Sequence, residues 1–199
     1  MTKTLEFLFD FGSPNAYVAY ARLPGVVERT GASVTWTPML LGGIFKATGN
    51  RAPGEVPAKG AYVRLETARH VARYGIPYQR NPDFPINTLA LMRGAVSLQM
   101  DGDFAAYVKL IFEAMWVRPR KLDDEAVLRA VLEDGGFDWS DFSDRIGRTA
   151  VKQRLIANTE SAVTRGVFGA PSFFVDDELF FGQDRLDWIE EMLSASALI

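Results

Sequence analysis

The fold of this 199-residue chain is decided first by one stretch, Phe9-Asp10-Phe11-Gly12-Ser13-Pro14-Asn15-Ala16-Tyr17. Apolar residues alternate over residues 4–9, which predicts a buried strand of about six residues. Ser13 followed by Pro14 is typical of a helix N-cap and a first helical residue. The helix should be kinked or broken at Pro24-Gly25 and continue to Gly31. A strand over 34–37 then completes a right-handed β-α-β unit with parallel strands.

A second stretch, Phe168-Gly169-Ala170-Pro171-Ser172-Phe173-Phe174, predicts a loop that runs into a strand. The pattern continues as a hairpin, with strands over 172–175 and 179–181 around the turn Asp176-Asp177. A closing helix is expected over 184–193. These pieces indicate that the two ends of the chain share one sheet, with the strand at 172–175 beside the first strand.

The middle of the chain is predicted to be almost entirely helical. Residues 42–58 are rich in Gly and Pro and indicate a loop with a short helix around Ile44-Phe45. Residues 76–87 contain three prolines and should be irregular. Helices are expected over 59–74, 88–100, 103–116, 123–133, 140–146 and 149–165. The predicted fold is therefore α/β and thioredoxin-like, formed by residues 1–41 and 167–199, with an all-helical insertion over 42–166.

The composition narrows the possible functions. A net charge of −3 and a pI near 5.3 argue against a nucleic-acid partner. No apolar run approaches the roughly 18 residues of a membrane span, and no signal peptide is recognisable, so a cytoplasmic protein is expected. With no cysteine and one histidine, the usual zinc sites are excluded and no metal is expected. Redox proteins of this fold carry Cys-x-x-Cys at the first turn, so its absence suggests that a ligand, glutathione, supplies the sulfur.

Ser13 allows two interpretations. As an N-cap, its hydroxyl would satisfy one free backbone N–H and contribute about 1 kcal/mol of stability. As a catalytic residue, it would hold a thiolate at the helix N-terminus, where the dipole and N–H donors lower a thiol pKa. A serine triad is disfavoured because the single histidine, His70, lies in the middle of a predicted helix.

Further candidate residues belong to a possible ligand site. The Ala170–Pro171 bond is predicted to be cis, because it precedes a strand beside the first one and faces Ser13, and a cis bond would present backbone groups to a peptide ligand. The alternative is an ordinary trans turn. Asp184 is either an N-cap or the partner of an α-amino group, with the backbone of Gln183 receiving the neighbouring carboxylate. Asn50 and Lys59 are either surface residues or ligands of a carboxylate.

Four motifs together resemble the 2-hydroxychromene-2-carboxylate isomerases and their kappa-class glutathione transferase relatives, of the DsbA-like branch of the thioredoxin fold. The resemblance covers essentially the whole chain. The motifs are Phe9-Asp10-Phe11-Gly12-Ser13-Pro14, Gly49-Asn50 followed by Pro57-Ala58-Lys59-Gly60, Phe168-Gly169-Ala170-Pro171 and Phe181-Gly182-Gln183-Asp184-Arg185-Leu186.

The resemblance implies an enzyme, a glutathione-dependent isomerase that interconverts 2-hydroxychromene-2-carboxylate and trans-o-hydroxybenzylidenepyruvate in aromatic catabolism. Ser13 would contact the glutathione sulfur, and the cofactor-binding positions would be Asn50, Lys59, Ala170, Pro171, Gln183 and Asp184. Trp116 is either core or a contact of the aromatic substrate, and Asn87 is a further substrate candidate. A homodimer is expected. The alternatives are a kappa-like transferase or peroxidase, and a non-catalytic binding protein.

Overall fold

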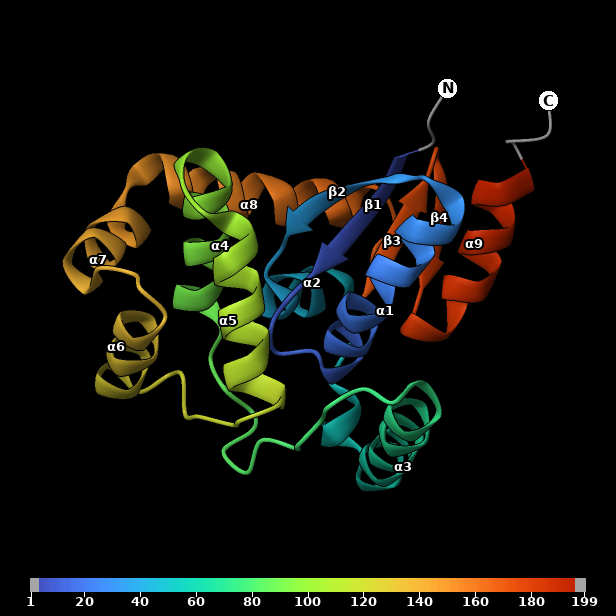
Figure 1. The fold of residues 1–199 in the computed structure, drawn as a ribbon, viewed down its shortest axis with the longest axis horizontal. Helices are drawn as coiled ribbons and strands as arrows, with labels where there is room; N and C mark the ends of the chain where they lie inside the picture. Colours follow the sequence, from blue (N-terminus) through green and yellow to red (C-terminus); the bar gives the residue numbers. More distant parts are fainter. Residues whose placement is uncertain (1–3, 196–199) are drawn as a thin grey trace.

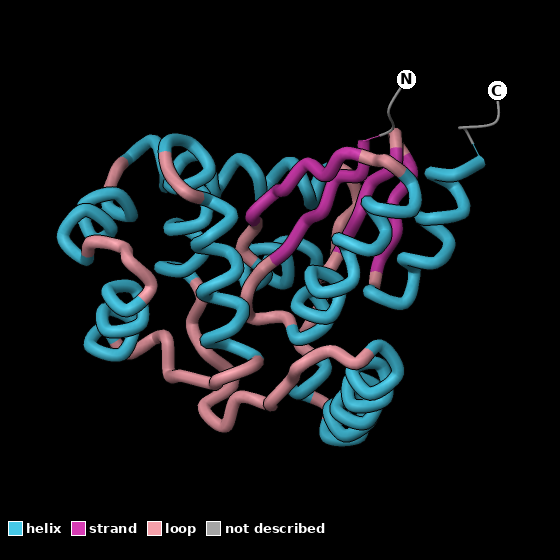
Figure 2. Tube along the Cα trace, viewed as in Figure 1, coloured by secondary structure: helices cyan, strands magenta, loops and turns pink. Residues whose placement is uncertain are grey.

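The computed structural model describes residues 4–195. The expected thioredoxin-like unit also includes residues 1–3 and 196–199, and these lie outside the described part. Within residues 4–195, four strands form one sheet in the order β2-β1-β3-β4 (Figures 1 and 2). They are β1 (Thr4–Phe9), β2 (Ser33–Pro38), β3 (Ser172–Val175) and β4 (Glu178–Phe181).

The pairing of the strands joins the two ends of the chain. β1 pairs with β2 in parallel and with β3 in antiparallel orientation, so β1 lies inside the sheet. β3 and β4 form the antiparallel hairpin that the turn at Asp176-Asp177 predicts. The predicted β-α-β unit, the hairpin and the pairing of the first strand with 172–175 are all confirmed.

Helices cover both faces of this sheet (Figure 1). α1 and α9 lie together on one side, and α8 crosses the other side with α2 beside it. α4 to α7 form a group next to the sheet, whereas α3 lies at the lower edge of the view. The bounds are α1 (Pro14–Thr30), α2 (Leu41–Thr48), η1 (Pro53–Glu55), α3 (Pro57–Tyr74), α4 (Leu89–Asp101), α5 (Phe104–Trp116), α6 (Glu125–Asp134), α7 (Trp139–Gly147), α8 (Thr149–Thr164), η2 (Gln183–Arg185) and α9 (Leu186–Ala195).

The core consists of two apolar clusters, one on each face of the sheet. Successive side chains of a strand point to opposite faces. Phe7 and Phe9 of β1 therefore join the larger cluster with α1, α4, α5 and α9. Leu8 of the same strand joins a smaller cluster with Ile44 of α2 and Ala162 of α8. β1 is thus buried on both faces, as the mixed apolar pattern of residues 4–9 predicts.

A break at Pro24-Gly25, one of the two expected outcomes, is wrong, because α1 continues through Pro24 to Thr30, while a kink there stays a prediction. Proline removes one backbone hydrogen bond from a helix. Here Leu23 and Val26, on either side of it, are buried in the core, so tertiary packing outweighs the local preference. The short helix expected near Ile44-Phe45 is confirmed as α2, while the closing helix is preceded by the separate turn η2.

The arrangement is a thioredoxin-like α/β fold with a large helical insertion, because α2 to α8 all lie between β2 and β3 in sequence. The division of the chain at residues 41 and 167 stays a prediction. Across residues 4–195, no helix has the length and apolar character needed to cross a membrane.

Gly94 of α4 should be required for the packing of the insertion. A Cβ at this position would contact the hydroxyl of Tyr107 and lie 2.6 Å from Cε2 of Phe142. We expect Gly94→Ala to lower the free energy of unfolding by about 1–3 kcal/mol, the usual cost of overpacking. The matched control is Gly42→Ala in α2, where an added Cβ meets nothing within 4 Å and should stabilise by up to about 1 kcal/mol. Urea denaturation of both variants tests this, and equal effects would contradict it.

Candidate active site

Ser13 lies where the two ends of the chain meet. It is the N-cap of α1, and its Oγ accepts a hydrogen bond from the N–H of Ala16 at 3.1 Å. The same hydroxyl donates to the carbonyl oxygen of Ala170 at 2.9 Å. The capping interpretation is therefore confirmed, and it coexists with direct contact between Ser13 and the loop before β3. The predicted cis conformation of the Ala170–Pro171 bond is confirmed as well.

Asp10 fixes the turn that presents Ser13. Its two carboxylate oxygens accept hydrogen bonds from the N–H groups of Gly12 and Leu41, each at 2.8 Å, and the Thr88 side chain adds a third bond. The carboxyl group thereby joins the starts of α1, α2 and α4. Burial raises the pKa of Asp10 above its ordinary value, although the three hydrogen bonds oppose this shift.

Asn50 lies against the loop that carries Ala170. Its Nδ2 donates to the carbonyl oxygen of Phe168 at 2.8 Å. Gly169 in this loop is required by close packing, since a Cβ there would lie 2.7 Å from the ring of Phe181. Lys59 is exposed in the first turn of α3. Its neighbour Gly60 lines a cavity together with Pro14, so the start of α3 lies near the start of α1.

Asp184 and Gln183 follow Gly182, whose N–H donates to the carbonyl oxygen of Pro171 at 3.0 Å. The carboxylate of Asp184 is exposed and pairs with Arg185 at 2.5 Å, and Gly182 rather than Asp184 is the N-cap of η2. Gln183 is buried, with 3% exposure. Its backbone oxygen accepts from Arg22 at 2.7 Å and its Oε1 at 3.3 Å, so the Gln183 side chain holds η2 to α1.

Trp116 is a core residue that also lines a cavity, while its contact with a substrate stays a prediction. It is 1% exposed, and its Nε1 donates to the carbonyl oxygen of Phe11 at 2.9 Å. It also lines, together with Pro14, a cavity of about 80 Å³. Its ring lies 6.0 Å from that of Tyr78 and 5.6 Å from that of Phe84, and both line the same cavity. These three aromatic rings therefore line a cavity next to Pro14, the residue that follows Ser13.

The segment that contributes Tyr78 is tied to α1. The hydroxyl of Tyr17 donates to the carbonyl oxygen of Pro77 at 2.5 Å, and burial raises the pKa of Tyr17 to about 12, which keeps it a donor. The Phe84–Pro85 bond in this segment is cis, which the sequence interpretation missed.

Two arginines that the sequence interpretation missed also line this cavity, namely Arg64 of α3 and Arg80. In the sequence, Arg64 is marked only by its basic charge near Lys59, and Arg80 only by its basic charge between two prolines. Both features are ordinary for surface residues. Asn87, in contrast, is not brought to Ser13. Its Oδ1 accepts from the N–H of Leu89 at 3.0 Å, and it lines a different cavity with Trp139 and Ile146.

Together, the fold and the site define a thioredoxin-fold protein with serine at the position where redox members carry cysteine. The DSBA-like thioredoxin domain model matches residues 4–194. The 2-hydroxychromene-2-carboxylate isomerase of Sphingobium xenophagum is 33% identical over 200 residues, which cover 97% of this chain and 99% of the relative. A solved structure of a 2-hydroxychromene-2-carboxylate isomerase matches with a TM-score of 0.85 and 28% identity, covering 98% of this chain and 96% of that one.

A more distant relative is human glutathione S-transferase kappa 1, which is 26% identical over 209 residues, covering 97% of this chain and 92% of the relative. The chain belongs to the DsbA-like thioredoxin family and, within it, to the group of the 2-hydroxychromene-2-carboxylate isomerases. The resemblance seen in the four motifs is confirmed.

The raised pKa of Asp10 predicts a specific pH dependence of stability. Between the ordinary carboxyl pKa of about 3.9 and the higher value in the folded protein, the folded state holds a proton that the unfolded state has lost. The wild type should therefore lose stability relative to Asp10→Asn as the pH rises through this window. Urea denaturation of both proteins between about pH 3.5 and pH 7 measures this difference. A wild-type advantage that grows with pH would show that the hydrogen bonds outweigh burial.

Proposed function

We propose that this protein is a glutathione-dependent isomerase that interconverts 2-hydroxychromene-2-carboxylate and trans-o-hydroxybenzylidenepyruvate. The observation that carries this proposal is the hydroxyl of Ser13, held at a helix N-terminus against Ala170 and beside an aromatic cavity. The chain contains no cysteine to act there. The full-length similarity to named isomerases supports the same conclusion.

The residues around Ser13 fit glutathione by charge and by backbone chemistry. Glutathione carries an ammonium group and a carboxylate at one end and a second carboxylate at the other. Asp184 would hold the ammonium group, while Lys59 and Asn50 would hold carboxylates. The side chain of Gln183 takes no part, because it is bound to Arg22. Bound glutathione would supply the thiol that this chain lacks.

Ser13 would favour the ionised form of that thiol. The helix N-terminus and a hydroxyl donor both stabilise a negative sulfur. In the structure the hydroxyl of Ser13 donates its proton to the carbonyl oxygen of Ala170. A hydroxyl has one proton, so turning it toward a sulfur would release the Ala170 carbonyl. That carbonyl would then accept an N–H group of a peptide ligand, as at a sheet edge.

The cavity beside Pro14 would receive the aromatic substrate. Its stacked rings, Trp116, Tyr78 and Phe84, suit a flat bicyclic molecule. Arg64 and Arg80 would bind the carboxylate of the substrate, and within residues 4–195 neither forms an ion pair. At about 80 Å³ the cavity is smaller than the roughly 300 Å³ of common ligand pockets, so entry would displace α3 or residues 76–87.

A kappa-type transferase or peroxidase is the second candidate, because human glutathione S-transferase kappa 1 is similar over nearly the whole chain. Conjugation of 1-chloro-2,4-dinitrobenzene, compared with isomerisation with and without glutathione, separates the two activities. A cytoplasmic location and a homodimer belong to this proposal too, and gel filtration with light scattering tests the dimer.

Ser13→Ala should reduce isomerase turnover by one to two decades. The variant loses one hydrogen bond to an anion, worth about 1.5–3 kcal/mol, and about 1.4 kcal/mol corresponds to one decade. Loss of the cap to Ala16 should also lower stability by about 1 kcal/mol. The measurements are turnover, the pH titration of bound thiolate by ultraviolet absorbance, and a melting curve.

The matched control for Ser13 is Asp103→Ala. Asp103 caps α5 through the N–H of Ala106 at 3.0 Å and lines none of the site described above. It should lose similar stability and keep full turnover. If both variants lose only stability and the thiol titration is the same as in wild type, Ser13 has a capping role alone.

Arg64→Gln should weaken the binding of carboxylate-bearing substrates. Loss of a charged hydrogen bond predicts an increase in KM of about tenfold or more for the chromene carboxylate. The Kd of glutathione should be little changed. The control is Arg69→Gln, an exposed position on the same helix that does not line the cavity. An equal loss of affinity for the chromene carboxylate and for glutathione would indicate a structural role for Arg64.

A further inference from the structure

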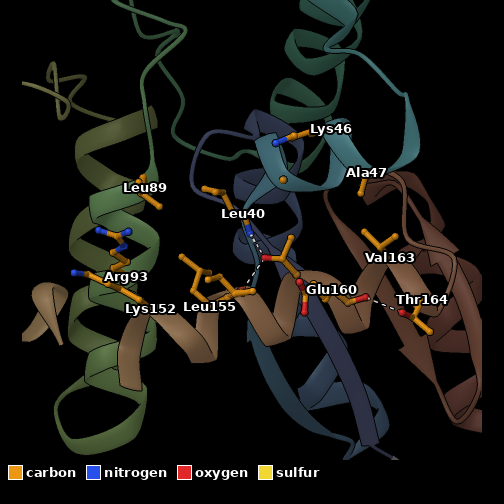
Figure 3. A pocket seen from close by; sticks show the side chains of 13 residues that line it. Leu40, Lys46, Ala47, Leu89, Arg93, Lys152, Leu155, Glu160, Val163 and Thr164 are labelled. Atoms are coloured by element: carbon orange, nitrogen blue, oxygen red, sulfur yellow. Dashed lines mark hydrogen bonds between the residues drawn. The ribbon is translucent and has the colours of Figure 1, made fainter. Parts of the chain in front are cut away.

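A second cavity, of about 720 Å³, lies between α2, α4 and α8 (Figure 3). It shares no lining residue with the cavity beside Pro14. Its volume falls within the roughly 300–1,000 Å³ that ligand pockets occupy. Nothing in the proposed reaction uses it.

The walls of this cavity are mainly aliphatic. Ile156 of α8 is 55% exposed and lines the cavity together with other aliphatic side chains. Apolar surface of this kind gains free energy when a ring or chain covers it. The aliphatic lining residues are Leu40, Ala47, Leu89, Leu155, Ile156 and Val163.

The charges in the cavity are predominantly positive. Lys46, Arg93 and Lys152 line it, against one acid, Glu160. In the part of the chain that the structure describes, none of these four takes part in an ion pair. Figure 3 shows Arg93 and Lys152 toward the same end of the cavity, with Glu160 further along α8. Two cations at one end of a cavity repel each other, and an anion between them would reverse this cost.

We propose that this cavity is a second binding site, for a small aromatic carboxylate, and that its occupant shifts the affinity of the glutathione site. The carboxylate lies between Arg93 and Lys152, and the ring covers Leu155 and Ile156. The choice of an aromatic ligand rests on the proposed function, in which substrate and product are both aromatic carboxylates.

α2 connects the two sites. At its start, the N–H of Leu40 donates to Thr159 Oγ1 in the cavity wall at 3.0 Å, and the N–H of Leu41 donates to Asp10 at 2.8 Å. Beyond its end, Asn50 donates to Phe168 in the loop of Ala170. A ligand that draws α2 toward α8 would therefore act on both the Ser13 turn and the cis-proline loop.

Calorimetry with 2-naphthoate tests the site, with the neutral naphthalene-2-carboxamide as the comparison ligand. We expect Lys152→Gln and Arg93→Gln each to weaken naphthoate binding by about tenfold or more. The matched control is Arg154→Gln, which removes the same charge from the same helix at an exposed position outside the cavity. Equal affinity for carboxylate and amide, or equal loss in all three variants, would overturn the proposal.

Photo-crosslinking locates the ligand independently of glutathione. 4-Benzoylbenzoate, an aromatic carboxylate with a photoreactive ketone, should label peptides of α2 or α8, and 2-naphthoate should suppress this labelling. Labelling confined to α3 and residues 76–87 would place the only carboxylate site beside Ser13 and overturn the second site.

The coupling is tested by the Kd of glutathione with and without saturating 2-naphthoate. A shift that is present in the wild type and lost in Lys152→Gln is expected. An unchanged Kd would overturn the coupling. If glutathione does not bind in either condition, the proposed function fails, whereas the crosslinking result still decides the second site.

Discussion

The hydrogen bond from Ser13 to the carbonyl of Ala170 depends on a single constraint, the pairing of β1 with β3. These strands come from opposite ends of the chain, and their antiparallel register places Leu8 opposite Ser172. The loop before β3 therefore ends beside the turn after β1. Without this register, the helix N-terminus and the cis-proline loop would be unrelated surfaces.

The carboxyl group of Asp10 holds together the segments around the same turn. A buried carboxyl group is costly unless its oxygens are satisfied, and here three helix starts supply the donors. The group thereby sets the relative positions of α1, α2 and α4. These helices lead to the residues on either side of the site, including Asn50 beyond the end of α2.

Much of this arrangement could be predicted from local sequence signals. A few neighbouring residues are enough to predict the strand β1, the helix start at Ser13-Pro14 and the loop at Ala170-Pro171. The order of these motifs along the chain indicates the family and the cis bond. Such signals are local because caps, turns and strands are themselves local.

Local sequence does not reveal features that depend on distant partners. Pro24 does not break α1, because the neighbouring Leu23 and Val26 are buried by other elements. The side chain of Gln183 is bound to Arg22, which is 161 residues away in sequence. Arg64 and Arg80 come together with Trp116 only through the packing of α3 against residues 76–87. No local pattern distinguishes such residues from ordinary surface charges.

The position of β1 inside the sheet also has a consequence for synthesis of the chain. On the ribosome β1 and β2 emerge first, and the edge of β1 that faces β3 remains open until residues 172–175 have been made. The helices encoded in between can form earlier, because their contacts are largely local. An open, apolar strand edge favours mispairing with other chains. Pairing of the C-terminal hairpin with β1 also brings the loop of Ala170 to Ser13. A chain that lacks residues 172–181 therefore has neither the complete sheet nor this contact.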